Sequence, residues 1–175
     1  MNFCGRRFNL YLLALTLALL ATGCTLLQHK PKETAALRIH IESEASSAGT
    51  GHNISVLRAQ PVSISIIDEP IITEANVISA RLIDAADGSF SLEIKLNQSG
   101  SWALEQYTSI NPGKHLVIFG QWSSKVSDGR WLAAPLIFRR MAGGTLVFTP
   151  DASHEEIEKF VEGLNRIAKK NTSQK

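Results

Sequence analysis

The stretch Phe90-Ser91-Leu92-Glu93-Ile94-Lys95-Leu96 alternates apolar and polar side chains without exception. A period of two is typical of a strand with one buried face. The preceding segment 77–83 is also strand-like, and Asp87-Gly88 between the two supplies the positive φ that a hairpin turn needs. We therefore expect an antiparallel hairpin at the centre of the fold.

The segments on either side predict an α+β protein. The expected strands are 37–42, 54–57, 62–67, 115–122, 131–140 and 145–148, and the expected helices are 99–108 and 153–170. This order predicts a mostly antiparallel sheet with two helices packed on one face.

Three local patterns refine this prediction. The run 116–119 is apolar without alternation, which indicates a central strand covered on both faces. Ser153 and Glu156 have the spacing of a capping box at the start of the second helix. The first helix is expected to bury the side that carries Trp102, Ala103, Gln106, Tyr107 and Ile110.

Residues 69–165 resemble the head of the first periplasmic domain of SecD, a subunit of the bacterial protein-export translocase. The residues that carry the resemblance follow the family's order: Pro70-Ile71-Ile72, Val77-Ile78-Ser79-Ala80, Gly88, Phe90 to Leu96, Gly100, Thr108-Ser109-Ile110-Asn111, Gly113-Lys114, Ala133-Ala134-Pro135-Leu136-Ile137, Gly143 or Gly144, and Glu155-Glu156. The resemblance implies a SecD-head-like fold and binding of extended or apolar polypeptide. It does not imply export activity, because SecD is driven through several membrane helices and no segment after residue 23 is long and apolar enough to span a bilayer.

The first 24 residues resemble the leader of a bacterial lipoprotein. Arg6 and Arg7 precede an uncharged apolar run over 10–21, and the small residues 21–23 lead directly into Cys24. The prediction is a signal peptide over 1–23 and acylation of Cys24, which would tether the protein to the lipid bilayer. A plainly secreted protein and an uncleaved anchor are the alternatives. Thr25 implies delivery to the outer membrane, facing the periplasm, in an organism with two membranes.

The remaining chain is expected to comprise a flexible tether (24–36), one domain (37–170) and a polar tail (171–175). Cleavage would remove Arg6 and Arg7 from 18 basic residues and none of the 16 acidic ones, leaving 16 of each. This balance gives no support for nucleic-acid binding. Cys4 would leave with the leader and Cys24 would be acylated, so we expect no disulfide, metal site or cofactor.

The residues give no sign of catalysis. His29, His40, His52, His115 and His154 lack metal-ligand spacing, and the sequence contains no nucleophile elbow or phosphate loop. His115 and His154 are expected to be solvated or capping side chains, and His29, His40 and His52 are expected in a tether, on a polar strand face and in a loop. We therefore predict that the protein is not an enzyme.

A binding surface is the functional alternative. Trp122 and Trp131 flank the turn at Asp128-Gly129, and Arg130 stands beside Trp131; such side chains are frequent anchors at interfaces. Packing of both indoles in the core is the competing interpretation, and exposure of both would favour a contact surface. An edge strand near 37–42 is a second candidate, through strand addition.

The predicted function is thus a non-catalytic envelope lipoprotein that binds envelope or exported polypeptides or acts as an accessory factor in protein export or envelope assembly. The alternative is a structural component of an envelope complex with no client binding. A hydrolase with an unrecognised site is a remoter third.

Overall fold

The structure is a computed structural model, and it describes residues 35–43 and 51–173. The chain divides into two units, Met1–Lys32 and Glu33–Lys175, and the described residues belong to the second unit. The expected signal peptide, Cys24 and all but the end of the expected tether lie outside the described residues.

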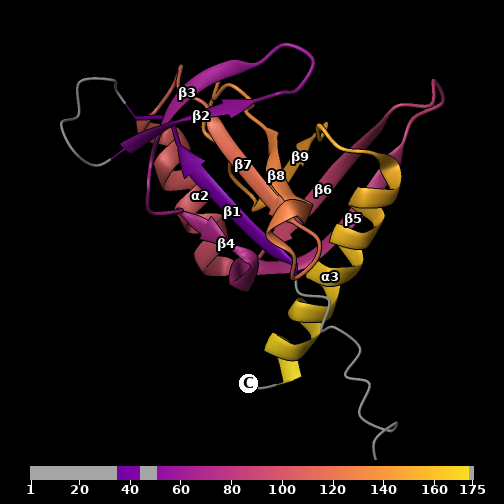
Figure 1. The fold of residues 1–175 in the computed structure, drawn as a ribbon. Helices are drawn as coiled ribbons and strands as arrows, with labels where there is room; N and C mark the ends of the chain where they lie inside the picture. The colour runs from indigo at the N-terminus through magenta and orange to yellow at the C-terminus, as the bar shows by residue number, and fades with distance from the viewer. Residues whose placement is uncertain (1–34, 44–50, 174–175) are drawn as a thin grey trace, which may run out of the picture. The chain divides into compact units, whose positions relative to one another are not determined.

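A four-stranded antiparallel sheet has the order β4-β1-β7-β8, where the strands are β1 (Ala36–Ile41), β4 (Ile72–Thr73), β7 (Leu116–Gln121) and β8 (Gly129–Ala133) (Figure 1). The expectation of an edge strand near 37–42 is wrong, because β1 pairs with β4 on one side and with β7 on the other. The expectation that 116–119 lies in a central strand is confirmed, since β7 has a neighbour on each side and buried side chains on both faces.

β8 is shorter than the predicted strand 131–140. It ends at Ala133, two residues before Pro135. Proline has no backbone N–H with which to continue a ladder, so the chain leaves the sheet after one further isolated pairing between His115 and Leu136.

The hairpin predicted at 77–96 is present in a three-stranded antiparallel sheet of order β5-β6-β9, with β5 (Val77–Asp84), β6 (Phe90–Leu96) and β9 (Thr145–Phe148). Gly88 adopts φ 81°, as its turn requires. The hairpin tip projects beyond the neighbouring elements (Figure 1).

A separate two-stranded ribbon is formed by β2 (Gly51–Val56) and β3 (Val62–Ile67). The strands of the described residues are thus divided among three antiparallel sheets, where the sequence predicted one. At its turn, the ribbon is fixed to the rest of the fold by Arg58, whose backbone N–H and Nε donate to the carboxylate of Asp151 at 2.8 and 3.3 Å.

The first described helix, α2 (Gln98–Ile110), begins at Asn97, whose side chain accepts a hydrogen bond from the amide of Gly100 at 2.9 Å. Its buried residues are Gly100, Leu104 and Thr108. The predicted buried side is wrong at both of its ends, because Trp102 is 64% exposed and Ile110 is 68% exposed. Thr108 tolerates burial because its hydroxyl donates to the carbonyl of Leu104 at 2.7 Å.

The second described helix, α3 (His154–Ser173), starts with the predicted capping box. The amide of Ser153 donates to Glu156 at 2.9 Å, and the amide of Glu156 donates back to the hydroxyl of Ser153 at 3.3 Å. α3 continues to Ser173, three residues past the expected end of the domain. It packs against β5. There the side-chain amide of Asn165 accepts from the backbone N–H of Ala80 and donates to the carbonyl of the same residue, each at 2.8 Å.

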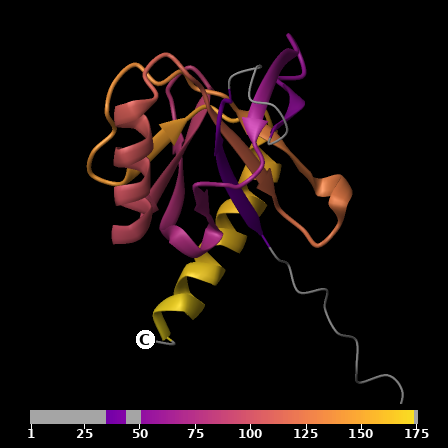
Figure 2. The same cartoon turned by 90° about the vertical axis from the view of Figure 1, so that its left-hand side faces the viewer.

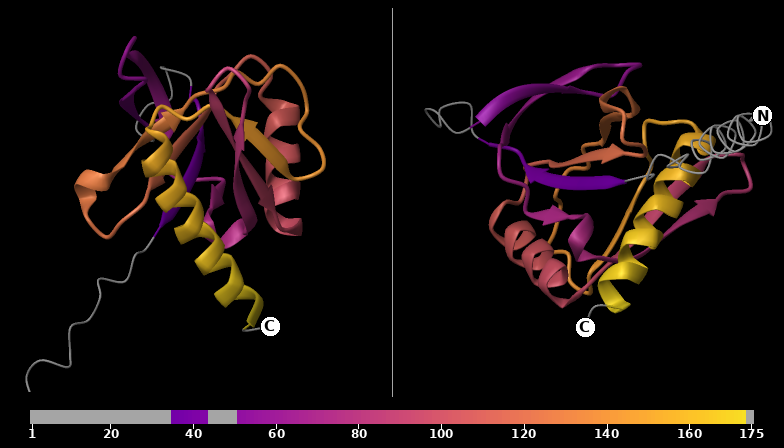
Figure 3. Two further views of the ribbon diagram at one scale, coloured as in Figure 1. Left: turned by 90° about the vertical axis from the view of Figure 1, so that its right-hand side faces the viewer. Right: turned by 60° about the horizontal axis from the view of Figure 1, so that its bottom comes forward.

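Two hydrophobic clusters hold these elements. The main cluster lies between the four-stranded and three-stranded sheets and includes Leu104 of α2 and Ile157, Phe160 and Leu164 of α3. α2 and α3 occupy separate positions around it (Figures 2 and 3). The second cluster, made by the ribbon and Val117, covers the other face of the four-stranded sheet. The predicted α+β class is confirmed.

Candidate functional site

The four-stranded sheet has two chemically different faces. The inner face carries the apolar side chains that enter the main cluster: Leu37, Ile39, Ile41, Leu116, Ile118 and Leu132. The outer face carries the side chains that alternate with them: Arg38, His40, Val117, Phe119 and Trp131. The strand register places Arg38 opposite Phe119, and Phe119 opposite Trp131, so these three form a row across the outer face.

A cavity of about 500 Å³ opens between the outer face and the ribbon. Its volume lies within the range of small-ligand pockets. The sheet contributes four lining residues, which are Arg38, His40, Phe119 and Trp131. The ribbon and the segment after it contribute His52, Ile66, Asp68 and Pro70.

Aromatic rings form one wall of this cavity. The indole of Trp131 meets the ring of Phe119 edge to face, with centroids 5.3 Å apart, and meets the imidazole of His40 in the same way at 5.6 Å. Such contacts are favourable beyond the area that they bury. Trp131 is consequently held by packing on two sides while its partly buried surface still borders the cavity.

His40 is the most enclosed polar group of the cavity, with 5% of its surface exposed. Its Nδ1 lies 2.8 Å from the carbonyl oxygen of Ile67. Because a carbonyl only accepts hydrogen bonds, Nδ1 carries the proton and Nε2 is the acceptor. Burial lowers the pKa of His40, and the hydrogen bond to Ile67 offsets part of this lowering. The net lowering of the pKa favours the neutral imidazole. Nε2 has no hydrogen-bond partner among the described residues.

The charged groups at the cavity are not equally engaged. His52 Nδ1 lies 2.6 Å from Asp68 Oδ1, so these two exposed side chains satisfy each other. Arg38 is exposed and forms no ion pair or hydrogen bond through its guanidinium with any described residue. The cavity therefore presents one unpaired cation at its mouth.

The residues predicted as a binding surface separate onto opposite sides of the sheet. Trp122 is 8% exposed and belongs to the main cluster, whereas Trp131 borders the cavity. The guanidinium of Arg130 lies 4.9 Å from the centroid of the Trp122 ring, a cation–π contact. Trp122 therefore does not meet the exposure criterion for a contact surface. Neighbouring residues of a strand face opposite ways, which separates Arg130 from Trp131.

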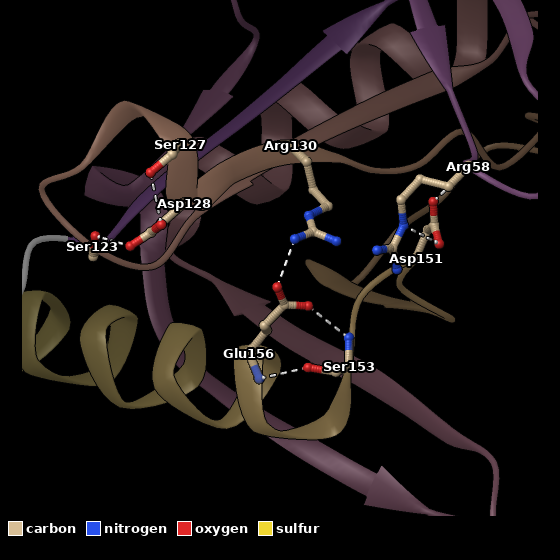
Figure 4. A network of polar contacts seen from close by, with 8 residues as sticks. All are labelled: Arg58, Ser123, Ser127, Asp128, Arg130, Asp151, Ser153 and Glu156. Carbon is tan, nitrogen blue, oxygen red and sulfur yellow. Dashed lines mark hydrogen bonds and ion pairs between the residues drawn. The ribbon is translucent and has the colours of Figure 1, made fainter.

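Arg130 connects β8 to the start of α3 (Figure 4). Its Nη2 donates to Glu156 Oε1 at 2.6 Å, while the other oxygen of Glu156 belongs to the capping box. Nη1 of Arg130 is buried without a hydrogen-bond partner, and the guanidinium is stabilised by the Trp122 ring and by Glu156. Near by, Ser123 and Ser127 donate to Asp128 at 2.5 and 3.0 Å, and these bonds, that of Ser123 foremost, lower the pKa of Asp128 (Figure 4).

The histidines considered for catalysis have carboxylate or backbone partners. His115 Nδ1 lies 2.6 Å from Glu42, and His154 Nε2 lies 3.1 Å from Asp84. His29 lies outside the described residues. Within residues 35–43 and 51–173, no three histidine, cysteine, aspartate or glutamate side chains converge as a metal site would require.

Sequence reasoning missed the cavity and the two polar residues that the sheet contributes to it, Arg38 and His40. The alternation over 37–42 placed Arg38 and His40 on one face, which was the only local signal. Their proximity to Phe119 and Trp131 depends on strand pairing across about 80 residues of chain, which the register alone defines.

No family model and no curated protein matches the chain. Three of the solved structures that resemble it are structures of SecDF. The first, "Structure and function of a membrane component SecDF that enhances protein export", has a TM-score of 0.54 and 21% identity, over 77% of this chain and 63% of that chain. The second is SecDF in a super-membrane-facing form, with a TM-score of 0.48 and 16% identity over 90% of this chain and 33% of that chain.

The third is SecDF from Thermus thermophilus, described as a translocon-associated membrane protein, with a TM-score of 0.37 and 14% identity over 91% of this chain and 34% of that chain. The chain thus spans less than two thirds of the first structure and about one third of the other two. The likeness to the first structure establishes the fold: the described residues form an α+β domain of SecD-like architecture, as the sequence predicted. No described helix is long and apolar enough to cross a membrane.

Proposed function

We propose that this chain is a lipid-anchored protein of the bacterial envelope whose SecD-like domain binds polypeptide without catalysis, as an accessory factor in protein export or envelope assembly. The observation that carries the proposal is the fold shared with a membrane component that enhances protein export. The open cavity with an aromatic wall supports it, because such a wall suits side chains exposed on an extended polypeptide.

Polypeptide binding is tested with the full chain in detergent. A fluorescently labelled polypeptide kept unfolded by reduction and alkylation of its disulfides should show saturable binding by anisotropy, while the same polypeptide folded with its disulfides intact should not compete. Equal binding of both forms, or of neither, contradicts the proposal.

The alternative is a structural component of an envelope complex. Co-purification from solubilised membranes separates the two functions, because a client-binding protein yields mixed polypeptides and an assembly component yields one constant set. Substitution of Trp131, which borders the cavity, should reduce capture of mixed polypeptides.

The anchor is proposed at Cys24, with delivery to the outer membrane where the organism has two. The sequence offers a matched control, since Cys4 and Cys24 are its two cysteines. Cys24→Ser should abolish incorporation of labelled palmitate and release the cleaved chain from membranes, because no acyl chain then holds it. Cys4→Ser should change neither result. Palmitate labelling that persists in Cys24→Ser, or tight membrane association of its cleaved chain, contradicts the anchor.

A further inference from the structure

The cavity between the outer face and the ribbon contains three groups whose interactions are incomplete. Trp131 and Phe119 offer an apolar wall, His40 offers a hydrogen-bond acceptor, and Arg38 offers a positive charge. A ligand that satisfies all three groups must have a ring or apolar body, a hydrogen-bond donor and an anionic group.

We infer that this cavity binds an extended polypeptide segment in which an aromatic residue and an acidic one stand two positions apart, so that both side chains face the sheet. The aromatic ring lies against Trp131 and Phe119, and the carboxylate pairs with Arg38. The inference rests on the proposed function, and it specifies which segments of a polypeptide the domain selects.

The acceptor at His40 defines the donor that the ligand must supply. Nδ1 is committed to the carbonyl of Ile67, so Nε2 of the neutral ring remains as an acceptor. Nε2 keeps some solvent-accessible surface, because Arg130 Nη1 is the one buried side-chain nitrogen or oxygen without a partner in the part of the chain that the structure describes. A ligand N–H or O–H can therefore reach Nε2 and donate to it. A backbone amide or a tyrosine hydroxyl is such a donor, which makes tyrosine the favoured aromatic residue.

The charges favour an acidic neighbour over a basic one. Asp68 also lines the cavity, but its carboxylate is held by His52 at 2.6 Å. Arg38 has no such partner among the described residues. Arginine pairs with carboxylates through parallel hydrogen bonds, so an acidic side chain beside the bound ring is the matching group.

The test uses a labelled, end-blocked hexapeptide with a central Glu-Ser-Tyr sequence, called the Glu-Tyr peptide below, and three relatives, in which glutamate becomes glutamine, tyrosine becomes phenylalanine, or tyrosine becomes alanine. Binding to the full chain in detergent is measured by fluorescence anisotropy. Loss of the carboxylate should weaken binding about fivefold to tenfold, as expected for a charge-assisted pair near the surface. Loss of the ring should weaken it at least about tenfold. Loss of the hydroxyl should weaken it about twofold to fivefold.

The protein variants isolate Arg38. Arg38→Gln should weaken the Glu-Tyr peptide about fivefold to tenfold and leave the Gln-Tyr peptide unchanged, because the two changes remove the same interaction. Arg139→Gln removes an exposed arginine that does not line the cavity, so it should alter neither affinity. Thermal unfolding should be the same for both variants. Raising the salt concentration should reduce the advantage of the Glu-Tyr peptide over the Gln-Tyr peptide.

Equal affinity for the Glu-Tyr and Gln-Tyr peptides overturns the inference, and so does an equal effect of Arg38→Gln on both. If the unfolded polypeptide binds while the peptide series shows no preference, the proposed function stands and the selectivity fails. If no polypeptide binds, both fail.

Discussion

The inner and outer faces of the four-stranded sheet are built by alternate residues of the same strands, yet they differ in what their side chains leave unsatisfied. On the inner face, Leu37, Ile39 and Ile118 are completely enclosed in the main cluster. On the outer face, His40 retains a free acceptor, and Arg38 has no ion-pair partner among the described residues. One face therefore serves stability, and the other has chemistry left for a ligand.

The largest difference should appear between the neighbours Ile118 and Phe119. Ile118→Ala leaves a void in an enclosed core and should lower the free energy of unfolding by about 2–5 kcal/mol. Phe119→Ala enlarges a cavity that is already open and should cost about 1–2 kcal/mol. Urea unfolding measures both. Equal losses would mean that the two faces contribute alike to stability.

A second pair of substitutions adds volume to each face. A Cβ at Gly120 would lie 2.4 Å from Leu132 Cδ1 and 3.1 Å from Phe160 Cζ, and both neighbours are fully buried. Gly120→Ala should therefore destabilise by about 1–3 kcal/mol.

Gly129→Ala is the matched change on the outer face. A Cβ there would lie 2.8 Å from Phe119 Cζ, the far end of a ring that borders the cavity and has room to shift. Its cost should stay within about 0.5 kcal/mol. A loss at Gly129 as large as that at Gly120 would show that the ring has no such room.

The smallest effect should be a pH dependence of stability that arises from His40. Besides burial, the charges of Arg38 and His52 lower the pKa of this residue, and that of Asp68 raises it. The pKa of His40 is lowered in the folded state, so the unfolded chain takes up this proton first, near its ordinary value of 6.5. The free energy of unfolding should fall as the pH drops below 6.5, and it should stop falling once the pH is below the pKa of His40 in the folded state. Glu93 and Asp128 affect stability at lower pH. A hydrogen bond from Arg81 holds the pKa of Glu93 below its ordinary value of 4.5, and one from Ser123 holds the pKa of Asp128 below 3.8.

Unfolding of wild type and His40→Gln between pH 7 and pH 5 checks this dependence. The wild type should lose more stability over that interval than His40→Gln. His154→Gln, at an exposed position, controls for the removal of a histidine. Parallel curves for wild type and His40→Gln would exclude His40 as the titrating group.

The sequence was informative where a local pattern records burial along one strand or the capping of one helix. The alternation over 90–96 predicted β6, the unbroken apolar run over 116–119 predicted a strand covered on both faces, and Ser153 with Glu156 predicted the capping box. Each pattern arises from neighbours within a few residues. The side of α2 was mispredicted because Thr108 satisfies its hydroxyl locally and is buried, while the apolar Trp102 is not.

The candidate site was less predictable because it depends on register. Arg38, Phe119 and Trp131 are brought into one row by the pairing of three strands, and the ribbon that closes the cavity is fixed by the distant pair of Arg58 and Asp151. No local pattern records such pairings. The two tryptophans flank the same turn in the sequence, yet one enters the core and the other borders the cavity.

Asn165 has a consequence for how copies of this protein behave at high concentration. An unpaired outer strand is a template on which identical chains stack into fibres. At Ala80 the side-chain amide of Asn165 occupies both the donor and the acceptor that another strand would need, and α3 packs against β5. The helix thus protects this edge of the sheet from pairing with the same edge of another copy.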